Sequence, residues 1–248
     1  SKDGSFTLQI STTDLNNARS TFETTYTYDS TPPALQSSTP DNNKNVGPGL
    51  QITFFLNEAP SSFTFYVVSG GTCSFTSPSS SVISISTTID SCDHEGLYTI
   101  GAEVTDSLGN TGNVQVTYNY DITPPTINSA NPSVSFRANQ TLVLTLSEDI
   151  GSFGASFAVI SGSNCTFFFP RRSGISEASV GVTSCESDGP KTIQVTLTDL
   201  VGNIGTSDLN LIYDNTPPTA TFNPPINANI RRTQIVTITC NEPIGTAS

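Results

Sequence analysis

Methionine and tryptophan are absent from the 248-residue sequence, and His94 is its only histidine. The absence of tryptophan argues against an antibody-type immunoglobulin domain, which packs a tryptophan against its disulfide. The sequence has no nucleophile elbow, P-loop, dinucleotide fingerprint or metalloprotease motif, and with one histidine we do not expect an enzyme. Because position 1 is not methionine, we expect this chain to be a segment of a longer protein.

Charge is also scarce, since charged residues make up 12% of the chain against roughly 25% in globular proteins. The 9 basic and 21 acidic residues give a net charge of −12. Nucleic acid is therefore an improbable partner, because it requires a basic face. No apolar run reaches the ~18 residues that a membrane helix needs, and we expect neither a membrane span nor a signal peptide in this stretch.

One hexapeptide, Tyr-Asp-x-Thr-Pro-Pro, occurs three times, at residues 28–33, 120–125 and 213–218. Its copies begin 92 and 93 residues apart (120 − 28 and 213 − 120). A period near ninety residues predicts tandem domains. We expect the C-terminal part of one repeat at 1–29, complete repeats at 30–122 and 123–215, and the N-terminal part of another repeat at 216–248.

Two segments of each repeat alternate between apolar and polar residues, which is typical of half-buried β-strands. No stretch has a helical period. About seven strands in roughly 92 residues is the size of an immunoglobulin-like sandwich. The sequence predicts an all-β chain of tandem immunoglobulin-like β-sandwich domains with Greek-key connections. The apolar positions of the first alternating strand are Ile52, Phe54 and Leu56, then Leu142, Leu144 and Leu146, then Val236, Ile238 and Cys240; those of the second are Tyr98, Ile100, Ala102 and Val104, then Ile193, Val195 and Leu197.

Four of the five cysteines form two pairs that repeat in register, Cys73 with Cys92 and Cys165 with Cys185. This pattern predicts one disulfide per domain and hence an oxidising, extracellular compartment. Zinc is the competing interpretation, but two thiols without a partnering histidine or a Cys-x-x-Cys motif give too few ligands. Cys240 occupies a core-facing position, and we expect any partner to lie beyond residue 248.

Three motifs resemble the bacterial-type Ig-like tandem repeats of large cell-surface adhesins and surface-layer proteins. They are Asp-x-Thr-Pro-Pro at the junctions, the Ser-Glu-Asp-Ile step at 147–150 with its Asn-Glu-Pro-Ile counterpart at 241–244, and the Asp-x-x-Gly-Asn turns at 106–110 and 199–203. The resemblance spans the whole chain, although most such repeats lack a regular disulfide. It implies a cell-surface location, a structural or adhesive role, and neighbouring Ig-like domains of the same protein as partners.

In each complete repeat an acidic residue lies two positions after the last core-facing residue of each alternating strand, so its side chain is expected to point inward as well. An inward-pointing carboxylate is costly unless it has a partner. In an Ig-like Greek key the second and sixth strands end at the pole where the first begins, so these acids and the junction aspartate converge there. A hard cation with several oxygen ligands relieves the repulsion. Calcium-stiffened junctions in related adhesin arrays point to Ca²⁺. The predicted metal ligands are Asp29, Glu58 and Asp106; Asp121, Glu148 and Asp199; and, as the start of a third set, Asp214 and Glu242.

Local capping is the alternative interpretation of these acids. The aspartate of Asp-x-x-Gly-Asn, and the aspartate before Thr-Pro-Pro, can each accept hydrogen bonds from nearby backbone N–H groups without a metal. The two junction prolines fix φ and hold the preceding threonine extended. The junction is therefore a short, stiff strut in either case.

Asn139 and Asn164 begin two sequons, and we expect both on exposed loops if the source glycosylates its proteins. Phe167, Phe168 and Phe169 form an unusual run, and a regular strand would turn one or two of the rings outward. The favoured function is an extracellular structural or adhesive stalk or fibre of rigidly linked domains. The alternative is a glycan- or receptor-binding surface module, and self-assembly into a filament is a third possibility.

Overall fold

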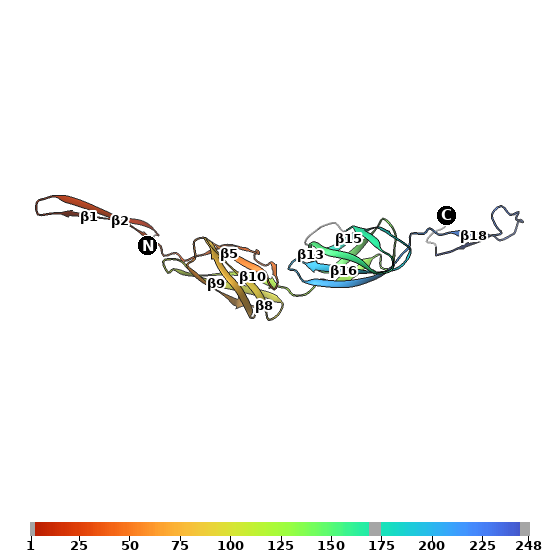
Figure 1. The fold of residues 1–248 in the computed structure, drawn as a ribbon, viewed down its shortest axis with the longest axis horizontal. Coiled ribbons are helices and arrows are strands. Elements are labelled where there is room, and N and C mark those ends of the chain that lie inside the picture. Colours follow the sequence, from red (N-terminus) through yellow and green to blue (C-terminus); the bar gives the residue numbers. More distant parts are fainter. Residues whose placement is uncertain (1–2, 169–174, 244–248) are drawn as a thin grey trace. The chain divides into compact units, whose positions relative to one another are not determined.

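The computed structural model describes residues 3–168 and 175–243, and every regular element in these ranges is a β-strand (Figure 1). The all-β prediction is therefore confirmed, and within these residues there is no helix that could cross a membrane. The chain divides into two compact units, Ser1–Pro124 with Leu200–Asn203 and Pro125–Asp199 with Ile204–Ser248. The repeat boundaries drawn from the sequence remain predictions.

Two four-stranded sheets form the sandwich of the first unit, in the orders β3-β5-β8-β7 and β4-β10-β9-β6. Apart from the short β4, which pairs in parallel with β10, this is the seven-strand arrangement of an immunoglobulin-like domain. The strands are β3 (Leu35–Thr39), β4 (Asn45–Val46), β5 (Gln51–Leu56), β6 (Ser62–Ser69), β7 (Cys73–Ser81), β8 (Ser84–Cys92), β9 (Gly96–Thr105) and β10 (Thr111–Tyr120).

The alternating residues of β5 and β9 form the centre of this sandwich, as the sequence predicted. Ile52, Phe54 and Leu56 are fully buried, and so is Ile100 of the opposite sheet. Burying one such side chain contributes about 1.5–3 kcal/mol. The period of two therefore places the apolar faces of β5 and β9 against each other in the core.

The second unit repeats this order, but its second and third strands are continuous. The first part of β13 pairs with β15, and its last part pairs with β16. The equivalent stretch of the first unit contains Pro60, which cannot donate to a strand ladder and separates β5 from β6. The strands are β11 (Ile127–Asn131), β12 (Ser135–Phe136), β13 (Gln140–Ser161), β14 (Cys165–Phe168), β15 (Ile175–Cys185), β16 (Gly189–Asp199) and β17 (Ile204–Tyr213).

Each unit contains the disulfide predicted from the sequence. Cys73–Cys92 joins the neighbouring strands β7 and β8 at directly paired positions, and Cys165–Cys185 does the same for β14 and β15. Each bond therefore lies within one sheet, whereas the antibody disulfide crosses between sheets. Cys240 is the free cysteine of the described residues.

Two further hairpins lie outside the sandwiches, β1 (Gly4–Thr13) with β2 (Arg19–Tyr28) and β18 (Ala220–Asn223) with β19 (Thr237–Cys240). The sequence predicted that Val236 and Ile238 face a core, but their side chains are 46% and 59% exposed. Alternation identifies the apolar face of a strand, whereas burial requires a second sheet. Within the described residues, β18 and β19 form a two-stranded sheet only.

Candidate metal centre

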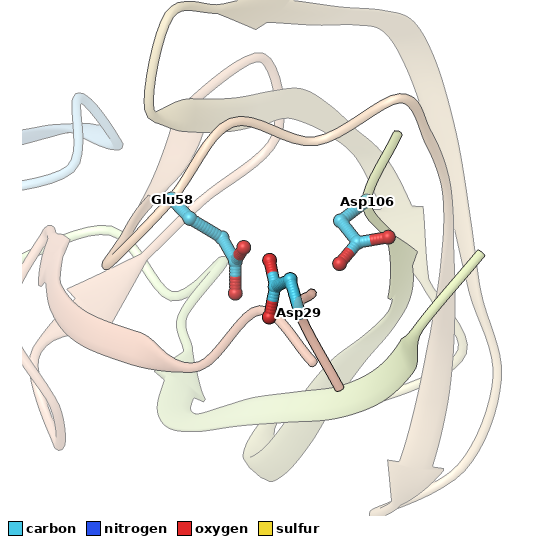
Figure 2. Close-up of side chains that lie close together, drawn as sticks. All are labelled: Asp29, Glu58 and Asp106. Carbon is cyan, nitrogen blue, oxygen red and sulfur yellow. The ribbon is translucent and has the colours of Figure 1, made fainter. Parts of the chain in front are cut away.

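Three acids from separate segments meet at one end of the first sandwich. Glu58 follows β5 and Asp106 follows β9, while Asp29 lies between β2 and β3. Strand β3 begins where β5 ends, because Leu35 pairs with Leu56. In Figure 2 the carboxyl groups of Asp29, Glu58 and Asp106 turn toward a common point. The strand order thus brings together residues that are 29 and 48 positions apart (58 − 29 and 106 − 58).

The spacing of these carboxylates suits one ion. One oxygen from each of Asp29, Glu58 and Asp106 lies within 4.8 Å of the others. Oxygens that share one Ca²⁺ at about 2.3–2.6 Å can lie up to roughly 5.2 Å apart. Asp106 is buried, and the other two are half-buried. The donor set therefore fits a hard divalent cation, with positions left for water or backbone oxygens.

Asp106 also caps the turn that follows β9. Its Oδ1 accepts hydrogen bonds from the backbone N–H groups of Leu108 (2.8 Å) and Asn110 (2.9 Å), and its Oδ2 accepts one from Asn110 Nδ2 (2.8 Å). Burial opposes ionisation of this carboxyl, but these hydrogen bonds outweigh it and lower the pKa of Asp106. Local capping is therefore present. Of the four lone-pair positions of the carboxylate, these hydrogen bonds use three, so one on Oδ2 remains for a cation.

Asp29 takes part in a similar local contact. Its Oδ1 accepts a hydrogen bond from Thr31 N at 3.0 Å. Its backbone oxygen accepts one from Asn110 Nδ2 at 3.1 Å. Asn110 thus connects the turn after β9 to the junction segment, and it holds Asp29 and Asp106 in place without a metal.

Glu58 is the acid that capping does not explain. Among the described residues it accepts no hydrogen bond, and none of the three acids of this cluster has an ion-pair partner. Burial, followed by the charges of Asp29, Asp106 and Asp3, raises the pKa of Glu58 above its ordinary value of 4.5. A carboxylate that is held beside like charges without a donor is poorly placed unless a cation joins it.

The second predicted set includes residues of both units. Asp121 belongs to the first unit, where its Oδ2 accepts a hydrogen bond from Asn45 Nδ2 at 3.0 Å. Glu148 and Asp199 belong to the second unit, and a carboxylate oxygen of one lies within 4.8 Å of one of the other. Metal binding by these three residues together stays a prediction.

The third predicted set contains Asp214 and Glu242, both in the second unit. Burial, then the charges of Asp214 and Asp188, raises the pKa of Glu242. One carboxylate oxygen of Glu242 is buried and has no hydrogen-bond partner among the described residues. A hydrogen bond with the side chain of Asp214 also raises the pKa of Glu242, so Glu242 resembles Glu58 in its burial and like-charged neighbours but differs in having this contact.

Each repeat contains one further acid that the predicted metal ligands did not include. Asp3, Glu95 and Asp188 each stand directly before the glycine that begins β1, β9 or β16. The signal was available, because an acid-glycine pair recurs in register in all three repeats.

Both sequon asparagines, Asn139 and Asn164, are exposed and lie in loops. Phe167 packs on Phe157, with ring centroids 5.7 Å apart, whereas Phe168 is 68% exposed. Phe169 lies outside the described residues. One ring of the phenylalanine run therefore points inward and one outward.

No protein family matches the sequence, and no curated protein matches it. Among solved structures, a tandem of titin domains is 11% identical, with 86% of this chain and 74% of that chain covered and a TM-score of 0.36. Domains 4–9 of the surface layer protein SbsC are 14% identical, with 88% and 36% covered and a TM-score of 0.29. The human Desmocollin-1 ectodomain is 13% identical, with 87% and 48% covered and a TM-score of 0.30.

This chain thus spans about a third of the surface-layer fragment and about half of the desmocollin ectodomain. Identities and TM-scores this low carry no argument about function. The immunoglobulin-like fold rests on the strand order and pairing of the two units.

Proposed function

We propose that this chain is part of an extracellular stalk or fibre, in which rigidly linked Ig-like domains bind calcium where one repeat joins the next. The convergence of Asp29, Glu58 and Asp106 carries the proposal, because Asp29 belongs to the junction motif and the other two belong to the following sandwich. A shared ion would tie the junction to the ends of β5 and β9. The proposal includes no catalytic activity.

The disulfides support the extracellular part of the proposal. Disulfides between neighbouring strands persist in oxidising compartments and are rare in the cytosol, and both complete sandwiches contain one. The net charge of −12 suits a surface that meets calcium and stays soluble. Glycans on Asn139 and Asn164 are compatible with this location because both side chains are exposed.

The function depends on what the residues themselves do. Asp106 and Asp29 are held in place by hydrogen bonds from Leu108, Asn110 and Thr31. Glu58 brings a third negative charge beside them. When bound, a calcium ion supplies the positive charge that offsets this repulsion. In its absence the three carboxylates repel one another and weaken the attachment of the junction to the sandwich.

Thermal unfolding with and without calcium tests this function. At an affinity near 10⁻³–10⁻⁴ M, as in extracellular modules, about 5 mM calcium stabilises a one-site domain by roughly 1–2 kcal/mol. For a domain of this size, we expect the melting temperature of the first unit to rise by about 5–15 °C relative to a chelated sample. The variant Glu103→Gln is the matched control, since Glu103 is an exposed acid on β9; it should keep the full rise.

The proposal fails if calcium leaves the melting temperature unchanged while the domain stays folded. Capping by Asp29 and Asp106 would then be the whole role of these acids. An equal rise with magnesium would also count against the site, because Mg²⁺ demands a tighter octahedral shell than three protein carboxylates and flexible loops provide.

A recognition module for a glycan or receptor is the second candidate function. The exposed ring of Phe168 favours it, because a large aromatic side chain on the surface is a common contact in binding sites. The residues at the junctions favour the stalk, since the same motif recurs in every repeat whereas the phenylalanine run occurs once. Neighbouring Ig-like domains are the partners that the stalk requires, and filament assembly would extend it.

A further inference from the structure

An acid-glycine pair stands at the start of the same strand in all three repeats. The acids are Asp3, Glu95 and Asp188, and each lies 26 residues before the junction aspartate (29 − 3, 121 − 95 and 214 − 188). The glycine after each acid has a positive φ, for example +134° at Gly96, which favours glycine. In each repeat the glycine of the pair therefore provides a particular backbone conformation, and the acid provides a carboxylate at the same place.

The strand register explains what the acid meets. Strands β9 and β10 are antiparallel, and Gly96 pairs with Tyr120, the last residue of β10. The residue before Gly96 is Glu95, so its side chain lies beside the chain that leaves β10. Glu95 Oε1 accepts a hydrogen bond from Ile122 N at 2.7 Å, and the carboxylate accepts another from the side chain of Thr123.

The first repeat makes the same contacts. Asp3 Oδ1 accepts hydrogen bonds from Ser30 N at 3.0 Å and Ser30 Oγ at 2.8 Å, and Asp3 Oδ2 accepts one from Thr31 Oγ1. The partners are again the two residues that follow the junction aspartate. These contacts lie wholly within the first unit.

The third copy, wholly within the second unit, repeats them. Asp188 Oδ1 accepts a hydrogen bond from Asn215 N at 2.9 Å, and Asp188 Oδ2 accepts one from Thr216 Oγ1. The variable residue of Asp-x-Thr-Pro-Pro thus contributes its backbone N–H, which any residue except proline provides. The threonine contributes its hydroxyl, which explains why threonine stands at that position.

The junction aspartate binds the remaining donor of the linker. Asp29 Oδ1 accepts a hydrogen bond from Thr31 N at 3.0 Å, and Asp121 Oδ1 accepts one from Thr123 N at 3.2 Å. The two prolines have no N–H group. Every N–H group and the threonine hydroxyl of x-Thr-Pro-Pro are therefore accounted for, and the segment cannot rotate freely without breaking several hydrogen bonds.

We propose that Asp3, Glu95 and Asp188 are positioning residues that clamp the linker leaving their own domain and fix its direction. Hydrogen bonds from the linker, first those of the threonine hydroxyls, lower the pKa of all three acids, which agrees with an ionised carboxylate as the acceptor. The clamp needs no metal. Its mechanical consequence rests on the stalk proposed above, since the direction of a linker matters where domains are rigidly joined.

The test uses the whole chain with Glu95→Ala, Glu95→Gln and, as matched control, Glu103→Ala, since Glu103 is an exposed acid on the same strand β9. Amide hydrogen exchange at Ile122 reports on the clamp directly. We expect exchange to accelerate about tenfold or more in Glu95→Ala, because the charged acceptor of that N–H is lost. Glu95→Gln keeps one oxygen acceptor and should fall between Glu95→Ala and the native chain. Glu103→Ala should match the native chain.

A second readout separates positioning from ordinary stability. Spin labels on noncanonical residues at Gln115 and Thr206, both exposed strand positions, report the width of the distance distribution between the two sandwiches. We expect Glu95→Ala to widen it about twofold while the melting temperature of the first unit changes little. Unchanged exchange at Ile122 in Glu95→Ala overturns the clamp.

The two proposals fail in different ways. A native distribution that is already broad, with and without calcium, contradicts the rigid stalk, and the clamp is then decided by the exchange rate at Ile122 alone. A narrow native distribution that stays narrow in Glu95→Ala leaves the stalk standing and removes the positioning role of Glu95. A large fall in the melting temperature of Glu95→Ala, without a wider distance distribution, also removes that role, because Glu95 would then stabilise only its own domain.

Discussion

Two carboxylates of the Asp29, Glu58 and Asp106 cluster have pKa values that shift in opposite directions. Asp106 has a lowered pKa because hydrogen bonds from Asn110 and Leu108 outweigh its burial. Glu58 has a raised pKa because burial and neighbouring carboxylates act on it without such donors. The carboxylate of Asp106 thus has hydrogen-bond donors without a metal, whereas Glu58 is the residue through which the proposed cation would change stability most.

The raised pKa of Glu58 predicts how stability varies with pH without calcium. Stability linked to this group is fully present below its ordinary pKa of 4.5 and is lost as the pH rises through the folded value. In chelator, we expect Glu58→Gln to melt close to the native chain near pH 4. It should melt at a higher temperature than the native chain near pH 7, because the amide removes one of the like charges.

Calorimetric scans of both chains from pH 4 to pH 7 measure this difference. With calcium the order should reverse at neutral pH, since Glu58→Gln lacks a ligand and gains little from the ion. A difference that does not change with pH would show that Glu58 is not held among like charges. Glu103→Gln, with its acid on an exposed strand position, serves as the control and should follow the native chain.

Sequence reasoning located the acids that follow β5 and β9 because strand parity extends past the last core residue. It did not locate the clamp acids. Glu95 and Ile122 are 27 positions apart, and only the register of β9 with β10 places them side by side. The acid-glycine pair is visible in the sequence, but the hydrogen bonds that give it meaning depend on the hairpin.

At the scale of elements, alternation predicted the buried faces of β5 and β9, where Phe54 and Ile100 are fully buried. It did not predict that β13 runs unbroken through the stretch where Pro60 separates β5 from β6 in the first unit. It also placed Ile238 in a core, whereas that side chain is 59% exposed. Alternation in the sequence identifies the apolar face of a strand. Whether the strand is interrupted depends on proline, and whether its apolar face is buried depends on the presence of an opposite sheet.

The contribution of each disulfide to the stability of its own sandwich can be measured separately. Cys73–Cys92 closes a loop of 19 residues between the ends of β7 and β8. Closing a loop of this length contributes on the order of 3 kcal/mol in the chain-entropy model. We expect the double variant Cys73→Ser/Cys92→Ser to lower the melting temperature of the first unit by roughly 10–20 °C.

Differential scanning calorimetry checks this prediction, with the second unit as the internal control because it keeps Cys165–Cys185. Its transition should stay where it is in the native chain. If the first transition does not move, the disulfide adds nothing beyond the pairing of β7 with β8. The calcium-dependent rise should persist in this variant, since the acids lie outside that hairpin.

At the scale of the whole molecule, the repeat of Asp-x-Thr-Pro-Pro predicted tandem domains, and each unit contains an immunoglobulin-like sandwich. The linker has few free donors, since the junction aspartate and the clamp acid accept its N–H groups and the threonine hydroxyl. Prolines fix its φ angles. These prolines and hydrogen bonds are concentrated at the junctions, and they support the proposed stalk.

Small-angle X-ray scattering of the whole chain, with about 5 mM calcium and then with excess chelator, tests the central claim most directly. The account predicts a larger maximum dimension and a sharper distance distribution with calcium than without it. It also predicts that Glu58→Gln reduces this response, whereas Glu103→Gln does not. Scattering curves that superimpose with and without calcium, from a chain that remains folded in both conditions, would contradict calcium-stiffened junctions.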